Sequence, residues 1–335
     1  MAQADKAEND PHLKPMQFRP LIIIRHIPNI DFMGLHKLGF LLSAILTIGS
    51  IALFLTQGLN FGIDFAGGTL IEVRTQGPAD LAAMRNTLNG LGLGEVSLQG
   101  FGSPDEVLIR VARQAGDDQA QMAAVTKVKA ALGNSVEYRR TEVVGPKVGG
   151  ELIHAGVLAT VLALIAIGLY VWLRFQWQFG VGAMLSTLHD TITTVGLFSL
   201  LQIEFNLTTL AAILTIAGYS VNDTVVIYDR VRETMRKYKT MDFRTLINKS
   251  LNETLSRTIL TVSTVALVVL AFLHLGGEVL RGLSIAMLWG IVIGTYSSLF
   301  IAAPLLYYVQ PPRVGGSGAT AESETSKAKE LERTA

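Results

Sequence analysis

Cysteine is absent from this sequence of 335 residues. Its absence excludes disulfide bonds, thiolate metal sites and cysteine nucleophiles. Charge is also scarce, because Asp, Glu, Lys and Arg together make up 16% of the residues, whereas a soluble domain carries about 25%. The formal net charge of +1 excludes a strongly basic nucleic-acid-binding protein. We therefore expect no nucleic-acid partner.

The common motifs of soluble enzymes are missing as well. The glycine-rich segment 145–150 lacks the spacing and the Ser or Thr of a phosphate-binding loop. No two histidines stand at the spacing of a helical metal site. We therefore predict that the protein is not an enzyme and holds no cofactor or metal ion.

Long apolar stretches are abundant instead. Hydrophobic residues make up 50% of the chain, and the mean hydropathy is +0.41. Crossing a bilayer takes about 20 helical residues, and six stretches are long enough. They are Leu38–Leu55, His154–Leu173, Val181–Leu201, Asn206–Tyr228, Thr258–Leu275 and Ser284–Val309. The sequence thus predicts an α-helical polytopic membrane protein with six transmembrane helices.

The positions of Lys and Arg predict the orientation. Basic residues are frequent before the first span and in the connection 230–257, whereas the connection 202–205 has none and 276–282 has only Arg281. Both termini are therefore expected in the cytoplasm, with residues 57–153 on the other side of the membrane.

Residues 57–153 have the pattern of a small folded domain. Strands alternate with helices in the order β-α-β-β-α-β, which is typical of a ferredoxin-like α+β domain. The expected elements are Thr69–Arg74, Pro78–Leu91, Glu95–Gln99, Val107–Val111, Ala115–Leu132 and Ser135–Val144.

These patterns divide the chain into five parts. A cytoplasmic segment 1–37 precedes the first transmembrane helix 38–56, and the folded domain 57–153 follows. Residues 154–309 form the rest of the bundle, and the polar tail 310–335 is expected to be disordered.

Ionisable residues inside the spans are the candidates for function, since a charged side chain at the bilayer centre costs about 2.5–3.5 kcal/mol on insertion scales. Asp190 lies in the third span, Asp223 follows Asn222 in the fourth, and Arg257 opens the fifth. Counted from the basic ends of their spans, Asp223 and Arg257 lie at similar depth. Small and polar residues at helical spacing suggest a polar seam inside the bundle. They are Arg257, Thr261 and Thr264, then Gly182, Ser186 and Asp190, and finally Gly290 and Gly294.

An acid beside a cation in the membrane has two accessible states. Burial disfavours the charged carboxylate and a nearby guanidinium favours it, so movement of Arg257 or entry of water would load or release a proton. A proton crossing the membrane supplies about 2.3 kcal/mol per 100 mV. Structural alternatives remain open. Asp223 and Arg257 can form a static ion pair, Arg257 can anchor a helix end at the headgroups, and Asp190 can be a structural acid bonded to Ser or Thr.

Five motifs carry a resemblance to a known family. They are Phe61–Thr69, Val144–Leu152, Leu188–Asp190, Gly218–Arg230 and Leu255–Thr258. In these motifs, and over about residues 35–310, the chain resembles the SecF family of protein-export membrane proteins, which together with SecD belongs to the resistance-nodulation-division superfamily.

The resemblance implies a proton-motive-force-coupled accessory of the Sec translocon in the bacterial inner membrane, with a periplasmic loop domain. Asp223 and Arg257 match positions implicated in proton conduction in the family, with Asn222 and Asp190 as accompanying residues. Gly62, Asp64, Gly67 and Gly68 form a structural motif at the membrane exit. The implied partners are SecD, the translocon channel, unfolded preprotein and the lipid bilayer, with YajC and YidC as further candidates.

Two rival hypotheses remain. The chain can be half of a proton-driven exporter of small molecules or lipids from the same superfamily, although such exporters usually hold both halves in one chain. Alternatively, it is a membrane scaffold without transport of its own, in which the interior acids can become neutral together without loss of function.

Overall fold

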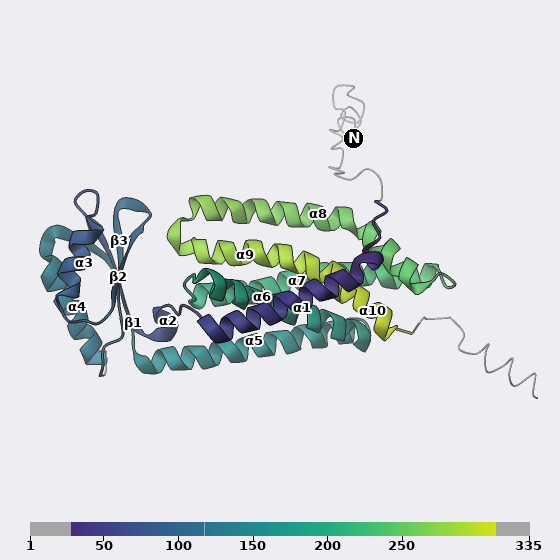
Figure 1. Cartoon of the computed structure of the whole chain (residues 1–335), viewed down its shortest axis with the longest axis horizontal. Helices are drawn as coiled ribbons and strands as arrows, with labels where there is room; N and C mark the ends of the chain where they lie inside the picture. The colour runs from purple at the N-terminus through teal and green to yellow at the C-terminus, as the bar shows by residue number, and fades with distance from the viewer. Residues whose placement is uncertain (1–27, 117, 313–335) are drawn as a thin grey trace, which may run out of the picture.

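The computed structural model describes residues 28–116 and 118–312. Long helices run side by side along the long axis, and a small sheet with two helices lies at one end of the bundle (Figure 1). Helix α1, Phe32–Gln57, leads to the sheet, and α5, Pro146–Arg174, leads back from it. The remaining bundle helices are α6 (Trp177–Leu201), α7 (Leu207–Lys237), α8 (Phe243–Leu275), α9 (Gly277–Ser297) and α10 (Ala303–Val309).

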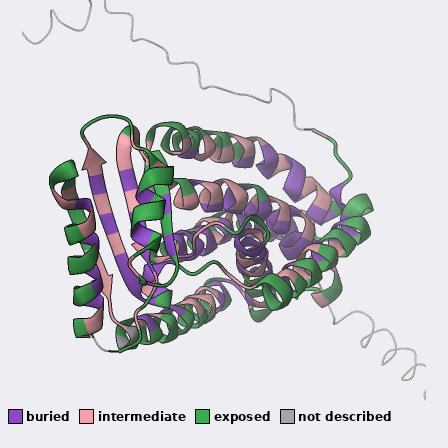
Figure 2. Cartoon of the chain, turned by 60° about the vertical axis from the view of Figure 1, so that its left-hand side comes forward, coloured by how far each residue is buried: buried purple, intermediate pink, exposed green. Residues whose placement is uncertain are grey.

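Five helical segments of the described chain are long and apolar enough to cross a membrane. They are Phe32–Gln57, Val148–Arg174, Leu207–Lys237, Phe243–Leu275 and Leu280–Val309. The predicted span Val181–Leu201 corresponds to α6, which is not one of the five. Helix α6 is rich in buried Gly, Ser and Thr, and these residues lower its hydropathy. Figure 2 shows buried residues where the bundle helices meet and exposed residues on their outward sides.

Helix α8 begins at Phe243, well before the predicted start at Thr258. The Asp242 carboxylate caps the helix by accepting a hydrogen bond from the backbone N–H of Thr245 at 3.1 Å. The first four turns then bury an apolar face that includes Leu246 and Leu251. Arg257 consequently lies within a continuous helix, about four turns after its first residue.

The last predicted span, Ser284–Val309, is interrupted. A π-helical turn, η2 (Ser298–Ala302), separates α9 from α10. Pro304 follows at the start of α10. Because proline has no backbone N–H, it cannot complete the regular hydrogen-bond ladder of the preceding turn. The distortion places Ser297 and Ser298 deep in the bundle, where both are buried.

The sheet unit has the predicted order β-α-β-β-α-β. Its elements are β1 (Gly68–Thr75), α3 (Leu81–Asn89), β2 (Val96–Phe101), β3 (Ser103–Val111), α4 (Asp118–Leu132), the 3₁₀ turn η1 (Gly133–Ser135) and β4 (Val136–Val144). The strands lie in the order β2-β3-β1-β4, and each neighbouring pair is antiparallel. Ile71, Val73 and Ile109 of the sheet pack with Leu88 of α3 and Val128 of α4 in a core of their own. The unit therefore has a hydrophobic centre separate from that of the bundle.

Helix α5 joins this unit to the bundle without a break. It begins at Pro146, a residue well suited to the first helical position because its missing N–H would have no partner there. The predicted boundary between residues 153 and 154 therefore falls inside α5. The predicted segment 1–37 lies mostly outside the described residues, as does nearly all of the tail 310–335.

Candidate functional site

Asp223 is buried in the middle of α7, with 3% of its surface exposed. Its Oδ2 atom has no hydrogen-bond partner in the part of the chain that the structure describes. A charged carboxylate without donors is unfavourable away from water. The position therefore holds an acid that its own protein surroundings do not satisfy.

Arg257 on α8 is the cation that acts on Asp223 electrostatically. Its side chain is exposed, whereas Asp223 is buried. Within the described ranges no ion pair at 4.0 Å or less joins the two groups. The structure thus brings the two predicted residues near each other without a contact ion pair. The alternative of a static, closed pair does not describe this arrangement.

Further polar groups lie on α7 and α8. Tyr219, one turn before Asp223, carries a buried hydroxyl with no partner among the described residues, and so does Thr258, which follows Arg257. Asn222 is exposed on the same helix. Buried polar groups are normally satisfied by protein or by ordered water. Three unsatisfied groups in consecutive turns of two facing helices mark a polar seam between α7 and α8.

Asp190 on α6 has the opposite environment. It is fully buried. Its carboxylate accepts hydrogen bonds from Ser220 Oγ of α7 at 2.5 Å and from Ser297 Oγ of α9 at 2.8 Å. His189 Nδ1 lies 3.0 Å from its other oxygen. These contacts match the structural alternative for Asp190, an acid bonded to serines on neighbouring helices.

The polar contacts continue along the same three helices. Ser186 Oγ donates to Ser297 Oγ at 2.9 Å. One turn further, the hydroxyls of Thr224 and Ser298 lie 2.8 Å apart. Sequence reasoning found Ser186 on the face of Asp190 but missed Ser220, Ser297 and Ser298. The serine pair one to two turns before Pro304 is the signal that could have found the last two.

The glycines at 290 and 294 mark close packing, as predicted. A Cβ atom on Gly294 would lie 3.0 Å from the Cβ of Ser220, and one on Gly290 would overlap Ile216. Both neighbours belong to α7. The missing side chains therefore let α9 approach the helix that carries Asp223.

The motif around Gly62 and Gly68 connects the sheet unit to α7. The segment forms a short helix, α2 (Ile63–Ala66), and Asp64 Oδ2 accepts a hydrogen bond from the Leu207 backbone N–H at 2.8 Å. Asp64 thereby supplements Asn206, whose side chain caps the same helix end.

Gly67 and Gly68 have φ values of +73° and +132°, which glycine adopts without strain. A Cβ atom on Gly68 would also lie 2.7 Å from the Val111 carbonyl oxygen. Both glycines are therefore required by the backbone path that leads from α2 into β1.

Two further contacts hold the sheet unit against the bundle. Arg110 of β3 forms an ion pair with Glu204 in the α6–α7 connection. Phe65 of α2 stacks on Phe205 with ring centroids 5.6 Å apart. The contacts made by Asp64, Arg110 and Phe65 are all to the first residue of α7 or to the connection before it. The sheet unit is thus attached at the N-terminal end of the helix that carries Asp223.

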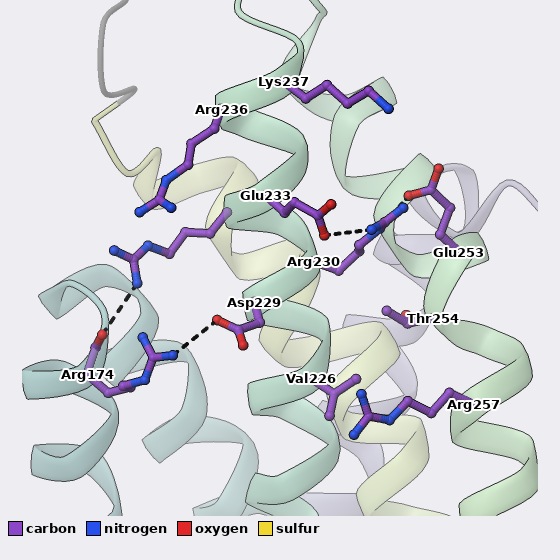
Figure 3. A pocket seen from close by; sticks show the side chains of 11 residues that line it. Arg174, Val226, Asp229, Arg230, Glu233, Arg236, Lys237, Glu253, Thr254 and Arg257 are labelled. Atoms are coloured by element: carbon purple, nitrogen blue, oxygen red, sulfur yellow. Dashed lines mark hydrogen bonds and ion pairs between the residues drawn. The ribbon is translucent and has the colours of Figure 1, made fainter.

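A cavity of about 950 Å³ opens at the other end of α7 (Figure 3). It is lined by side chains of α5, α7 and α8, most of them charged. Arg257 and Val226 lie on the bundle side of this cavity, and Arg236 and Lys237 lie furthest from the bundle. Arg257 thus borders both the cavity and the Asp223 site.

Fold and site together define a multi-span membrane protein with a buried polar seam. Residues 124–311 match the family described as protein export membrane protein SecD/SecF, C-terminal, and residues 52–79 match the SecD/SecF GG motif. Protein translocase subunit SecF of Rickettsia rickettsii is 46% identical over 295 residues, which cover 87% of this chain and 95% of that protein. The SecF subunit of Magnetococcus marinus is 46% identical over 304 residues, 89% of this chain and 96% of that protein. The chain belongs to the SecD/SecF family, in its SecF branch.

Solved structures agree with this assignment. The crystal structure of SecDF from Thermus thermophilus, a translocon-associated membrane protein, matches 84% of this chain with a TM-score of 0.74 and 33% identity. A second SecDF crystal structure, in a super-membrane-facing form, matches 91% with a TM-score of 0.61 and 33% identity. The chain spans only 39% and 40% of those two chains.

Proposed function

We propose that this chain is a proton-motive-force-coupled accessory subunit of the Sec translocon, which assists preprotein translocation across the inner membrane together with SecD. The observation that carries the proposal is the pair of Asp223 and Arg257. Among the described residues, the buried acid has no hydrogen-bond donor and the exposed cation that acts on it has no carboxylate partner. The acid in such a pair can be protonated and neutral, or it can lose its proton and be stabilised as a carboxylate by the nearby guanidinium. We expect no chemical catalysis by the chain itself.

Asp223 is the better candidate for the proton carrier than Asp190. Asp190 already accepts two serine hydroxyls and lies against His189, so a change in its protonation would disrupt contacts among three helices. Protonation of Asp223 breaks no hydrogen bond among the described residues. Asp190 instead positions the turn of α7 that precedes Asp223, and Asn222 on the exposed side of this turn supplies an amide that can hold water.

A path for mechanical coupling runs along α7. Asp64 and Glu204 tie the sheet unit to the N-terminal end of this helix, and Asp223 lies near its middle. A shift of α7 that accompanies proton exchange would therefore move the sheet unit. This movement is the step that we assign to preprotein transport.

We propose a six-span arrangement in the membrane, with α6 as the sixth span although its composition alone does not indicate one. Partly polar helices can cross a bilayer when their polar groups face the bundle, as the buried residues of α6 do. Both termini would lie in the cytoplasm of a bacterium, and the sheet unit would be a ferredoxin-like domain in the periplasm. The high density of Lys and Arg between residues 230 and 257 supports this orientation.

The exposed side of α7 is the contact that we propose for SecD. Ala211, Thr215, Gly218 and Asn222 form an exposed stripe at helical spacing, and small residues of this kind favour helix packing over contact with lipid. We propose that the SecD half packs here and completes the site. The translocon channel, YajC, YidC and unfolded preprotein remain proposed partners of the assembly.

The test is the replacement Asp223→Asn. It keeps the size of the side chain and removes the carboxyl group that can gain and lose a proton. Inverted membrane vesicles that contain the variant should carry out ATP-driven translocation and lose the stimulation by the proton gradient. Asp229→Asn is the matched control, because Asp229 is an exposed acid on the same helix and pairs with Arg174 at 3.7 Å. Full stimulation in the Asp223 variant would refute the carrier role.

Arg257 is tested by two replacements. Arg257→Lys keeps the positive charge and should retain part of the coupling, whereas Arg257→Gln should lose it. Equal loss in both variants would indicate that the packing of the arginine stem matters more than its charge. Retained coupling in the glutamine variant would refute the electrostatic role.

The identity of the subunit that binds this chain distinguishes the exporter hypothesis from this proposal. Purification of the tagged chain in mild detergent should bring down SecD. If the chain instead purifies with a second copy of itself and drives export of a small molecule, the exporter hypothesis is favoured.

A further inference from the structure

The cavity at the far end of α7 has an excess of positive charge. Its lining contains six basic side chains and three acidic ones. The basic residues are Arg174, Arg230, Arg232, Arg236, Lys237 and Arg257, and the acidic residues are Asp229, Glu233 and Glu253. A cavity of about 950 Å³ has room for a phosphate headgroup.

The three acids are already engaged. Asp229 pairs with Arg174 at 3.7 Å, and both Glu233 and Glu253 lie 2.6 Å from Arg230. Figure 3 shows these pairs on the walls of the cavity. The carboxylates therefore do not neutralise the remaining cations.

Three arginines around the same cavity lack a carboxylate partner among the described residues. Arg236 is exposed at the outer rim, and Arg257 borders the inner side. Arg232 contacts only neutral groups, namely the backbone oxygen of Arg174 at 3.4 Å and the ring of Phe175 at 5.5 Å. Planar guanidinium groups without a carboxylate partner, such as those of Arg232 and Arg236 one turn apart on α7, match the oxygens of a phosphate.

Exposed apolar side chains adjoin the charged lining. At the end of α5, next to Arg174, Trp172 is 56% exposed and Leu173 is 77% exposed, and Trp177 at the start of α6 is 53% exposed. Tryptophans of this kind mark the level of the membrane interface. On α8, Leu260 is exposed one turn beyond Arg257, towards the membrane. The cavity therefore lies where headgroups and acyl chains meet.

We propose that this cavity binds the phosphate group of an anionic phospholipid, with the headgroup at Arg232 and Arg236 and the acyl chains against Trp172 and Leu173. A soluble phosphate would use the same guanidinium groups but would gain nothing from the apolar border, which favours the lipid. The site does not depend on proton coupling, so its test and that of the proposed function can fail separately.

The test compares three probes on the full chain, purified in detergent together with any subunits that accompany it. Dioctanoyl-phosphatidylglycerol should raise the thermal unfolding temperature in a saturable manner. Dioctanoyl-phosphatidylcholine, which has no net charge, and inorganic phosphate at the same concentration should not. A similar rise with phosphatidylcholine, or with phosphate alone, would overturn the proposal of an anionic lipid site.

Variants locate the site. Arg236→Gln should weaken the binding of phosphatidylglycerol about tenfold, as expected for the loss of one charge-assisted contact. Glu233→Gln, at an exposed acid that competes for Arg230, should strengthen it. Arg244→Gln is the matched control, because Arg244 pairs with Asp31 at 3.8 Å at the same end of the bundle and does not line the cavity. Unchanged affinity in both Arg236→Gln and Glu233→Gln would overturn the assignment.

Discussion

The carboxylate of Asp190 accepts a hydrogen bond of 2.5 Å from Ser220, three residues before Asp223. The two acids are thus connected through one turn of α7, although only Asp190 is satisfied by the protein. This division separates a residue that fixes the position of the helix from one that is free to change its charge. It leads to predictions that differ for the two acids.

Removal of the Asp190 carboxylate should destabilise the bundle. In Asp190→Ala, the hydroxyls of Ser220 and Ser297 lose their common acceptor in a buried site. We expect a loss of about 1–2 kcal/mol in the free energy of unfolding, within the range measured for buried hydrogen bonds in proteins and membranes. Unfolding of the purified chain by a denaturing detergent measures this loss.

Asp223→Asn provides the comparison in the same experiment. No side-chain hydrogen bond of Asp223 is lost within the described residues, so its free energy of unfolding should stay within about 0.5 kcal/mol of the parent protein. Equal destabilisation in the two variants would contradict the division of roles.

Gly68→Ala should destabilise the junction between α2 and β1. The new Cβ would lie 2.7 Å from the Val111 carbonyl oxygen at a φ of +132°, and strain of this kind costs about 1–3 kcal/mol. Gly100→Ala is the control, because nothing lies within 4 Å of a Cβ atom at that position. Thermal unfolding should show a lower midpoint for the first variant only.

Asp64→Ala should loosen the N-terminal end of α7. The Leu207 N–H loses its acceptor, and the loss of a helix cap costs about 1 kcal/mol. Hydrogen exchange should become faster at residues 207–210 and remain unchanged near Asp223. Unchanged exchange at Leu207 would show that Asn206 alone holds the helix end.

Acid should weaken the sheet unit through Asp105. Hydrogen bonds from Ser103 and Arg74 lower the pKa of this carboxyl from 3.8 to about 2. Because the pKa is lower in the folded state, the contribution to stability is present above pH 3.8 and is lost as the pH falls towards 2. Asp105→Asn should remove this part of the pH dependence, which unfolding between pH 5 and pH 2 can measure. An identical pH profile in the variant would contradict the prediction.

Much of the architecture could be predicted because it depends on local patterns. Alternating apolar residues located all four strands, and each of the six predicted spans overlaps a helix. Helix ends were less predictable. The start of α8 depends on the tertiary burial of Leu246 and Leu251 and on a cap at Asp242, and neither raises the hydropathy of the segment.

The candidate site was predictable only in part, because the sequence reveals its ionisable residues but not the tertiary contacts that they make. Acids in apolar spans are conspicuous in a sequence, so Asp190 and Asp223 could be selected. The partners of Asp190 include serines, which are common inside membrane helices, and no spacing rule joins Asp190 to Ser297 across 107 residues. Nor does the sequence reveal that Asp64 caps a helix 143 residues away.

The central claim is that the Asp223 side chain gains and loses a proton. Infrared difference spectroscopy on the reconstituted chain and its co-purified partner measures this directly, since a protonated carboxyl in an apolar site has its own carbonyl band. We predict a band that changes as the pH is changed, that disappears in Asp223→Asn and that remains in Asp229→Asn. A titrating band that persists in Asp223→Asn, or the absence of any such band in the parent protein, would contradict the account.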